Sequence, residues 1–418
     1  AERKTVGRIS ALQARLEPLK VTPLLICLLL SGCVTQVVRT VDLTPPRQSA
    51  VPLTEEQLLD VGVAIFDSNI PEDYDVQIEQ LIQPEIRLAE ARYMPFVAKN
   101  LLQSTGNWGA VRVIPRATDA VDLTLHGRIL ESDGERLVIE ARVTDATGRL
   151  WFAKQYTGLA SKYAYTDSSA QEIDPFQSVY RDIADDMLSY RESLSLADVS
   201  AIRQTAEIKF ARSFASDAFA DYLAQQEDGQ YRLIRLPAEN DPMLKRVRDI
   251  REREYLFIDT LDDFYANHYR QMDAIYDGWR AATYADAIEY KALQAQSRSQ
   301  IIGGSIAIAA GIGGVYSSDN PYVDASSVAT VGAGAGLIIS GLNKKQQSAQ
   351  LADRLREIGA DAEAELIPTT IQLDRETLRL TGTVDEQYTE LRKILDRLYR
   401  AEFGLGSSNQ AQSSNTDP

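Results

Sequence analysis

The stretch 247–300 constrains the fold more than any other part of this chain, because it contains no proline and only one glycine, Gly278. Apolar residues, together with His268, recur in it about every 3.5 residues, which is typical of a long helix with an apolar seam. The residues in this pattern are Val247, Ile250, Phe257, Leu261, Phe264, His268, Met272, Ile275 and Trp279. We therefore predict one long helix, which at about 1.5 Å per residue would reach roughly 80 Å.

Aromatic side chains form a stripe along this predicted helix. They are Phe264, Tyr265, Tyr269, Tyr276, Trp279 and Tyr284. A stripe at helical spacing is more often core packing or a helix–helix seam than a ligand site. We expect these rings to be packed against other parts of the protein.

A second segment indicates where the chain resides. A basic leader precedes the apolar run Val21–Leu30, which ends in Leu30-Ser31-Gly32-Cys33. This is typical of a secretory signal, too short to span a membrane as a mature helix. The last four residues resemble the lipobox of bacterial lipoproteins. The resemblance implies cleavage before Cys33, a diacylglycerol on its thiol and an acyl chain on the new amino terminus.

The residue after the cysteine indicates which membrane holds the lipid. It is Val34 rather than the aspartate associated with retention in the inner membrane. By the rule of that family, the chain is attached to the outer membrane and faces the periplasm. We therefore assign 1–32 as a signal peptide and 33–52, which contains three prolines, as a lipidated tether.

The mature chain is strongly acidic. The full sequence has 44 Lys and Arg against 60 Asp and Glu, of which five and two lie in the leader, so residues 33–418 carry a net charge of −19. This charge argues against nucleic acid as a partner and against electrostatic docking on anionic headgroups. We expect the lipid to attach the protein to the membrane.

Cysteine and histidine are too scarce for the usual structural sites. The only cysteine besides Cys33 is Cys27, which lies in the predicted signal peptide, so the mature chain has no disulfide framework. With only His126 and His268 as imidazole ligands, a zinc site of the Cys/His kind is not expected. We predict no metal site, and no cofactor beyond the lipid on Cys33.

Residues 53–165 have the pattern of an α/β sandwich-like domain. Short apolar or alternating runs predict strands, and a longer run with helical spacing predicts a helix. The expected elements are a strand at 61–66, a helix at 76–104 and strands at 110–115, 121–131, 136–145 and 150–158. In the strand 136–145, Leu137, Ile139, Ala141 and Val143 should point to one side.

Four segments of this domain resemble a known periplasmic domain. They are Leu101–Gly106, Val111–Ile114, Asp122–Ile129 and Val143–Trp151. In this order they are similar to the domain shared by the curli-secretion channel lipoprotein, the amino-terminal domain of TolB and the lipoprotein activator of a penicillin-binding protein. The resemblance implies a domain that binds partners or self-assembles and has no catalytic residues.

The rest of the chain is predicted to be mainly helical, which gives an α+β protein overall. The expected parts are a helical region at 170–245, a long helical hairpin at 246–366, a small ββα module at 367–403 and a disordered tail at 404–418. In the ββα module we place strands at 369–373 and 377–384 and a helix at 385–402.

The tip of the hairpin, 301–342, contains two apolar runs rich in small residues. Their glycines include Gly303, Gly304, Gly311, Gly314, Gly332, Gly334 and Gly336. Such spacing lets helices approach closely. Three interpretations remain open: a helical hairpin buried in the protein or an oligomer, a hairpin inserted in the outer membrane, and a membrane-spanning β-hairpin. In each, these glycines are predicted membrane or oligomer contacts.

No nucleotide-binding or hydrolase motif is present in the sequence. The adjacent pairs Asp185-Asp186 and Asp262-Asp263 do not face one another on a helix, and we expect the acidic loop Asp67–Asp75 to be solvated rather than to bind calcium. We therefore expect a non-enzymatic assembly or scaffold component of an envelope complex, such as one for secretion or export. Its partners would be the outer membrane, other envelope proteins and further copies of itself. The alternatives are a periplasmic regulator of a cell-wall synthase and an envelope hydrolase with unrecognised carboxylates.

Overall fold

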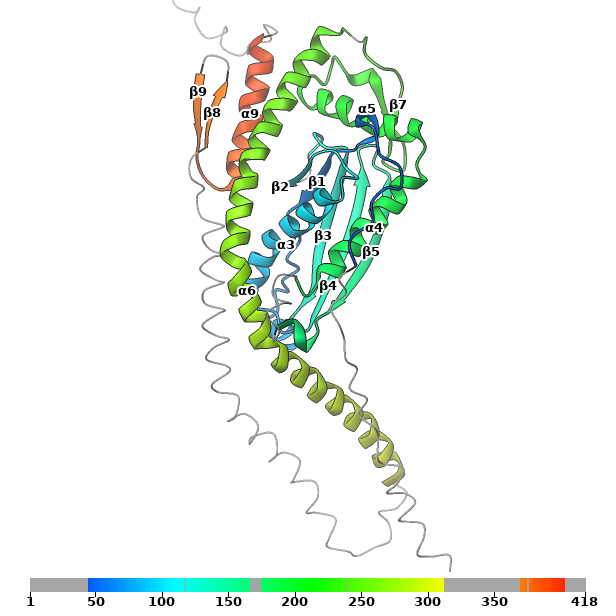
Figure 1. Cartoon of the computed structure of the whole chain (residues 1–418), viewed down its shortest axis with the longest axis vertical. Helices are drawn as coiled ribbons and strands as arrows, with labels where there is room; N and C mark the ends of the chain where they lie inside the picture. Colours follow the sequence, from blue (N-terminus) through cyan, green and yellow to red (C-terminus); the bar gives the residue numbers. More distant parts are fainter. Residues whose placement is uncertain are drawn as a thin grey trace, which may run out of the picture. The chain divides into compact units, whose positions relative to one another are not determined.

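The computed structural model describes residues 44–116, 118–165, 174–238, 240–311, 369–373 and 376–402. Within these residues the protein is α+β, as predicted, with a five-stranded mixed sheet packed against helices (Figure 1). Several predicted features lie outside the described residues. They are the signal peptide 1–32, Cys33, the tail 404–418 and the segment 312–368, which contains Gly314, Gly332, Gly334 and Gly336.

The sheet has the strand order β2-β1-β3-β4-β5. Its strands are β1 (Val61–Ala64), β2 (Val111–Ile114), β3 (Leu123–Ser132), β4 (Arg136–Asp145) and β5 (Leu150–Leu159). Strand β1 runs parallel to both of its neighbours, whereas β3, β4 and β5 form an antiparallel meander. The five strands lie close to their predicted bounds, which confirms those predictions.

Aspartate and glycine shape the two tight turns of the meander. Between β3 and β4, the Asp133 carboxylate accepts hydrogen bonds from the N–H groups of Glu135 and Arg136, at 3.0 and 2.9 Å. Gly134 in the same turn has a φ of +83°, which glycine adopts without steric cost. Between β4 and β5, Asp145 accepts from the N–H of Thr147 at 2.9 Å. Such turns fix the register of the strands on either side.

The helix predicted at 76–104 is two helices, so that prediction is wrong in part. Helix α2 spans Tyr74–Glu79 and helix α3 spans Pro84–Ser104. Leu81 between them has a φ of +56°, in the left-handed region that a continuing helix excludes. Pro84 reinforces the break, because a proline disfavours the helical conformation of the residue before it.

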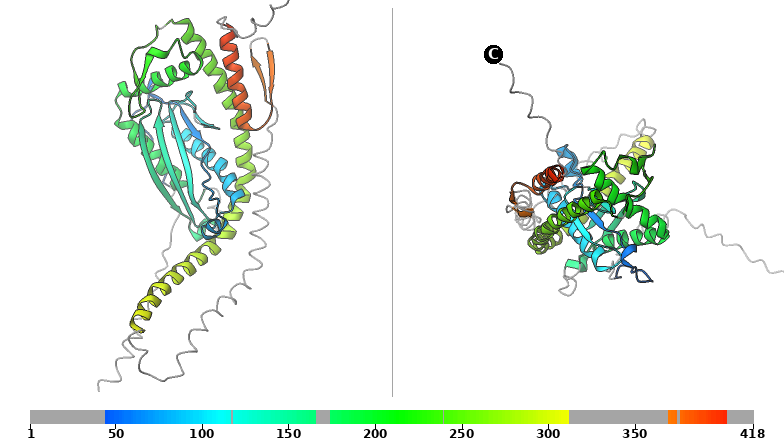
Figure 2. Two further views of the ribbon diagram at one scale, coloured as in Figure 1. Left: turned by 180° about the vertical axis from the view of Figure 1, so that it is seen from behind. Right: turned by 90° about the horizontal axis from the view of Figure 1, so that it is seen from above.

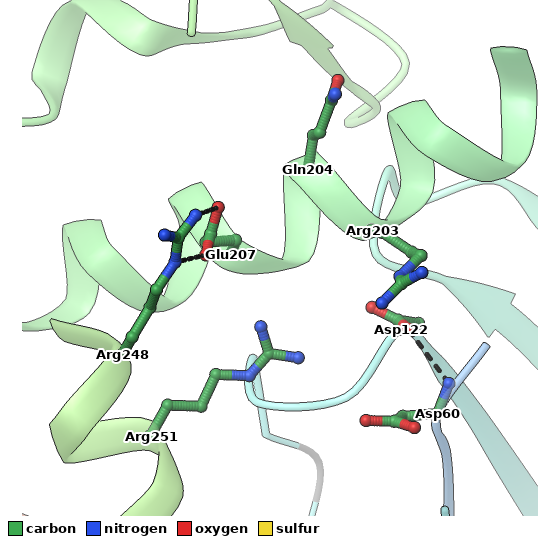
Figure 3. Close-up of a pocket in the computed structure, with 7 residues that line it drawn as sticks. All are labelled: Asp60, Asp122, Arg203, Gln204, Glu207, Arg248 and Arg251. Carbon is green, nitrogen blue, oxygen red and sulfur yellow. Dashed lines mark hydrogen bonds and ion pairs between the residues drawn. The ribbon is translucent and has the colours of Figure 1, made fainter. Parts of the chain in front are cut away.

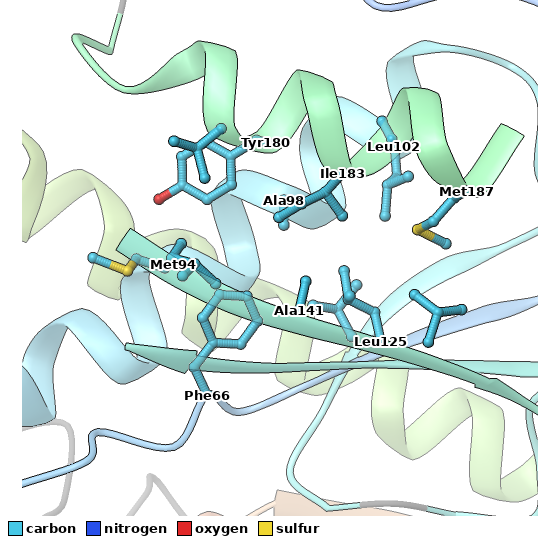
Figure 4. Close-up of a cluster of buried hydrophobic side chains, with 14 of the residues drawn as sticks. Phe66, Met94, Ala98, Leu102, Leu125, Ala141, Tyr180, Ile183 and Met187 are labelled. Atoms are coloured by element: carbon cyan, nitrogen blue, oxygen red, sulfur yellow. The ribbon is translucent and has the colours of Figure 1, made fainter. Parts of the chain in front are cut away.

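The main core lies between the sheet and two helices, α3 and α4 (Gln177–Ser193) (Figure 4). From β4, Leu137, Ile139, Ala141 and Val143 all face this core and are at most 1% exposed, which confirms the predicted alternation. Helix α3 contributes Ala98 and Leu102, and helix α4 contributes Tyr180, Ile183 and Met187. The other face of the meander carries exposed polar side chains, including Arg128, Arg142 and Gln155.

The segment 170–245 contains two helices and a short hairpin. Helix α5 (Leu196–Phe214) follows α4 after a tight break, and its first turn is capped by Ser195, whose hydroxyl accepts a hydrogen bond from the N–H of Asp198. Strands β6 (Leu223–Gln225) and β7 (Tyr231–Leu233) then pair antiparallel. Single 3₁₀ turns occur at η1 (Glu55–Gln57), η2 (Lys162–Tyr165) and η3 (Ala220–Tyr222).

Helix α6 (Pro242–Gly311, 70 residues) confirms the predicted long helix and extends it at both ends. Two buried clusters of side chains contain parts of it. The stretch from Leu244 to Tyr265 packs with α5, β2 and α9 (Val384–Glu402), whereas Met272, Tyr276 and Trp279 pack with the sheet and α3. The helix continues through 301–311, so this part of the glycine-rich segment is helical. Among the described residues, no helix combines the length and apolarity needed to cross a bilayer.

The predicted ββα module consists of β8 (Thr369–Leu373), β9 (Glu376–Leu380) and α9 (Val384–Glu402). The prediction that its second strand runs to Val384 is wrong at that end. Gly382 has a φ of +99°, and Thr383 caps the following helix by accepting the N–H of Glu386. Helix α9 lies beside the first half of α6 in both ribbon views (Figures 1 and 2).

Two leucines of the meander test which side of the sheet holds the core. Leu125 is fully buried, whereas Leu150 is 44% exposed. We expect Leu125→Ala to lower the free energy of unfolding by about 2–5 kcal/mol, because it leaves a cavity. The matched control, Leu150→Ala, should cost less than about 1 kcal/mol. Urea unfolding followed by circular dichroism measures both, and equal losses would contradict the described core.

Candidate functional site

Helix α6 is attached to the rest of the protein by a seam of aromatic rings. Tyr265, Tyr276 and Trp279 are at most 3% exposed. Tyr269 stacks on Tyr93 of α3 with ring centroids 5.1 Å apart. The predicted aromatic stripe is therefore core packing, as expected.

A buried carboxylate lies in this seam. Glu90 of α3 is 1% exposed and forms an ion pair with Arg87, also buried, at 3.2 Å. Its Oε1 accepts hydrogen bonds from Ser132 of β3 at 2.6 Å and from Tyr276 of α6 at 2.5 Å. Burial raises the pKa of Glu90 above its ordinary value, although Arg87 and the two hydroxyl groups oppose the shift. One carboxylate thus joins a helix, the sheet and α6.

A buried guanidinium lies on α6 one turn after Tyr276. Arg280 is 2% exposed and forms ion pairs with Asp174, at 3.2 Å, and with Asp277. It also stacks over the ring of Tyr276, with 4.2 Å from its central carbon to the ring centroid. Asp174 precedes α4, so this cluster ties α6 to the helix that covers the sheet.

A second buried carboxylate fixes the first half of α6. Glu254 has no exposed surface and accepts hydrogen bonds from Thr118 at 3.0 Å and from Tyr388 at 2.5 Å. Arg392 of α9 completes the cluster with an ion pair to Glu254 at 2.6 Å. Glu254 therefore connects α6 with α9 and with the loop that leads into β3.

Lys291 is the last residue of α6 with a described ion pair. Its ammonium group lies 2.8 Å from Glu131, 2.6 Å from Asp133 and 3.0 Å from Glu135, all at the β3–β4 turn. From residue 254 to residue 291, α6 is thus held by polar contacts to five parts of the protein: α3, α9, the loop before β3, the residues before α4 and the β3–β4 turn. We call the contacts of Glu90, Arg280, Glu254 and Lys291 the polar seam.

A polar cavity of about 240 Å³ lies where the amino ends of β1 and β3 meet helices α5 and α6 (Figure 3). Its lining residues are Asp60, Asp122, Arg203, Gln204, Glu207, Arg248 and Arg251. Asp122 is 3% exposed and accepts the N–H of Asp60 at 2.9 Å. Burial raises the pKa of Asp122 from 3.8 to about 6, against the opposing effects of that hydrogen bond and of Arg251.

Of the sequence-predicted site residues, the structure describes only three glycines, all at the end of α6. Gly303, Gly304 and Gly311 lie on the last turns of α6, whereas Cys33 and the other four predicted glycines lie outside the described residues. The described glycines all belong to the first apolar run, so the predicted contact between the two runs stays a prediction.

The two histidines, His126 and His268, lie apart from one another on β3 and α6. His268 of α6 is buried, with its ring 3.4 Å from the carbonyl oxygen of Ala89, and burial lowers its pKa to about 4. His126 of β3 is half-buried and lines a second cavity with Lys209. No group of three or more His, Cys, Asp or Glu side chains suited to a metal ion occurs in the part of the chain that the structure describes.

The adjacent aspartates considered in the sequence are engaged in separate contacts. Asp185 accepts the N–H of Arg47, and Asp186 accepts from Lys154 and Tyr156. Asp262 forms an ion pair with Lys99 at 2.9 Å. These contacts hold the helices to their neighbours.

Sequence reasoning missed the polar seam, although one signal was present. Glu254 falls on the apolar stripe of α6, between Ile250 and Phe257 at the helical spacing of four and three residues. A charge at such a position predicts a buried partner. No comparable signal marks the cavity, because its residues come from distant parts of the sequence.

Comparisons with known proteins give little further information. No protein-family model matches the chain, and no curated protein matches it. Among solved structures, it is similar to a PelC dodecamer from Paraburkholderia phytofirmans at 17% sequence identity, over 37% of this chain and 100% of that chain. The TM-score of 0.20 is too low for this likeness to bear on fold or function.

The polar seam predicts that replacing a buried carboxylate destabilises the protein more than replacing an exposed one. Glu90→Ala should lower the free energy of unfolding by about 3–5 kcal/mol, because it leaves the buried guanidinium of Arg87 without its partner. The control is Asp262→Ala, which removes an ion pair whose carboxylate is 40% exposed and should cost about 0–1 kcal/mol. Urea unfolding measures both. A loss at Glu90 no larger than that at Asp262 would show that the seam does not hold α6.

The raised pKa of Asp122 predicts a dependence of stability on pH. A carboxyl group with a higher pKa in the folded state stabilises the fold at low pH, and this contribution is lost as the pH rises from 3.8 to about 6. When the pH is raised from 4 to 7, the native protein should lose this contribution and Asp122→Asn should not. The free energy of unfolding of Asp122→Asn should therefore rise by about 1–3 kcal/mol relative to that of the native protein over this range. Urea unfolding at the two pH values checks this, and a constant difference would contradict it.

Proposed function

We propose that this chain is a non-enzymatic lipoprotein, anchored to the outer membrane through Cys33, that serves as an assembly component of an envelope complex such as one for secretion or export. Its partners would be other envelope proteins and further copies of the chain. Nucleic acid is not among them, since the sequence carries a net charge of −16.

The observation that carries this proposal is the lipobox-like sequence Leu30-Ser31-Gly32-Cys33 after an apolar run. Two or more acyl chains at one cysteine give stable membrane attachment, whereas a single chain binds only marginally. With Val34 in the following position, the resemblance points to the outer membrane.

The attachment of α6 supports an assembly role. The polar seam fixes this helix to α3, α9, the residues before α4 and the β3–β4 turn, and the same helix continues to Gly311. It would therefore carry the first glycines of the glycine-rich segment, Gly303, Gly304 and Gly311, on the end of a helix that is fixed to the α/β domain. Gly303 and Gly304 would let another helix approach closely, in the membrane or in a second copy of the chain.

The resemblance of 53–161 to the domain shared by the curli-secretion channel lipoprotein, TolB and the penicillin-binding-protein activator agrees with this role. Members of that group bind partners or self-assemble.

The two cysteines of the sequence provide a matched test of the anchor. In cells supplied with labelled palmitate, the native chain and Cys27→Ala should be labelled and should fractionate with the outer membrane. Cys33→Ala should be neither labelled nor processed, because it lacks the thiol that is acylated. Label on Cys33→Ala, or its absence from the native chain, would overturn the proposed anchor.

A further inference from the structure

Four charged side chains of the polar cavity at the amino ends of β1 and β3 form no ion pair with one another in the described part of the chain: Asp60, Asp122, Arg203 and Arg251. Arg251 of α6 points toward Asp122 and Asp60 from one side, whereas Arg203 of α5 lies beside Asp122 in this view (Figure 3). Both guanidinium groups are close enough to Asp122 to favour its charged form. Yet among the described residues neither arginine forms an ion pair within 4.0 Å with either aspartate.

Each arginine is held in place from outside the cavity. Arg251 donates from Nε to the carbonyl oxygen of Ala120 at 3.0 Å and from Nη2 to the hydroxyl of Tyr255 at 2.7 Å. Arg203 donates from Nη1 to the carbonyl oxygen of Glu55 at 3.1 Å. Among the described residues, Nη1 of Arg251 and Nη2 of Arg203 make no hydrogen bond, so these donors remain for a bound molecule.

The acidic side of the cavity is similarly arranged. Asp122 uses Oδ2 to accept the N–H of Asp60, and its Oδ1 makes no hydrogen bond within the described part of the chain. Asp60 is already engaged, because its Oδ1 accepts the N–H of Ala110 at 2.9 Å and its Oδ2 accepts from the hydroxyl of Tyr255 at 3.5 Å. Although Asp122 as a whole is only 3% exposed, its side chain lines the cavity, so a donor group of a bound molecule could reach this oxygen.

The third arginine is neutralised within the protein. Arg248 forms a two-pronged ion pair with Glu207, with nitrogen–oxygen distances of 2.5 and 3.1 Å. Two positive side chains, Arg203 and Arg251, and two negative side chains, Asp60 and Asp122, therefore remain without an ion pair in the cavity.

We propose that this cavity binds a small zwitterion, with its carboxylate on Arg203 and Arg251 and its ammonium group on Asp122. A simple anion would satisfy the arginines but would meet the aspartates, and a simple cation would have the reverse problem. A molecule with both charges matches both sides through charge-assisted hydrogen bonds. The volume of about 240 Å³ is smaller than that of most sites for drug-sized ligands, so an amino acid or dipeptide is the fitting size.

This inference is independent of the proposed function. It concerns the end of the sheet where α5 and α6 meet, whereas the anchor and the glycine-rich segment lie elsewhere in the sequence. Ligand binding here would brace α5 against α6, because the ligand would contact Arg203 of one helix and Arg251 of the other.

Isothermal titration of the purified full chain tests the proposal with defined probes. The zwitterions are glycine, L-alanine, L-glutamate, L-lysine and glycylglycine, and the comparison probes are acetate, methylamine, inorganic phosphate and glucose. We expect at least one zwitterion to bind at least tenfold more tightly than every comparison probe. Binding of phosphate or acetate with equal affinity would indicate an anion site, binding of glucose would indicate a polyol site, and binding of no zwitterion would exclude the proposed ligand. Each of these results would overturn the proposal.

Two variants locate the binding, and a third controls for surface charge. Asp122→Asn removes the charge that meets the ammonium group, and Arg203→Gln removes one that meets the carboxylate. Each should weaken zwitterion binding at least tenfold. Arg235→Gln, which changes an exposed arginine paired with Asp221, should leave it unchanged. If Asp122→Asn does not fold, Arg203→Gln still decides, and unchanged binding by either folded variant would contradict the proposal.

Discussion

Glu90 and Glu254 are carboxylates in a seam that excludes water, and the position of α6 depends on their being satisfied. A buried charge without a partner costs several kcal/mol, so only an arrangement that pairs each one is stable. In the described structure Tyr276 reaches Glu90, while Tyr388 and Arg392 reach Glu254. Sliding α6 by one turn would leave both carboxylates without these partners. Apolar packing supplies most of the attachment, and the polar contacts fix its register.

The same helix links features that are far apart in the sequence. Its first turns carry Arg248 and Arg251 at the polar cavity, its middle contacts α3 and α9, and Lys291 contacts the β3–β4 turn. A helix held at so many places transmits position well, because a shift at one contact strains the others. This is the property required of a part that would hold the segment 301–342 in an envelope assembly.

The sequence predicted the regular elements well, because each has a local pattern. Alternation in 136–145 and the absence of proline in 247–300 were sufficient for β4 and α6. The break between α2 and α3 was missed, since it depends on one residue, Leu81, in a left-handed conformation that leucine rarely adopts. The cavity was beyond prediction. Asp60 and Asp122 directly precede β1 and β3, and Arg203 and Arg251 lie on α5 and α6, so only the folded sheet and helices bring them together.

We infer a chain that is built for contacts with other molecules at the outer membrane rather than for chemistry. Crosslinking in intact cells, followed by purification of the full chain and mass spectrometry of what is joined to it, tests this claim most directly. We predict crosslinked species that contain further copies of the chain or other envelope proteins, with joined peptides from the region of α6 and 301–342. Recovery of the chain from the membrane solely as an uncrosslinked monomer would contradict the account.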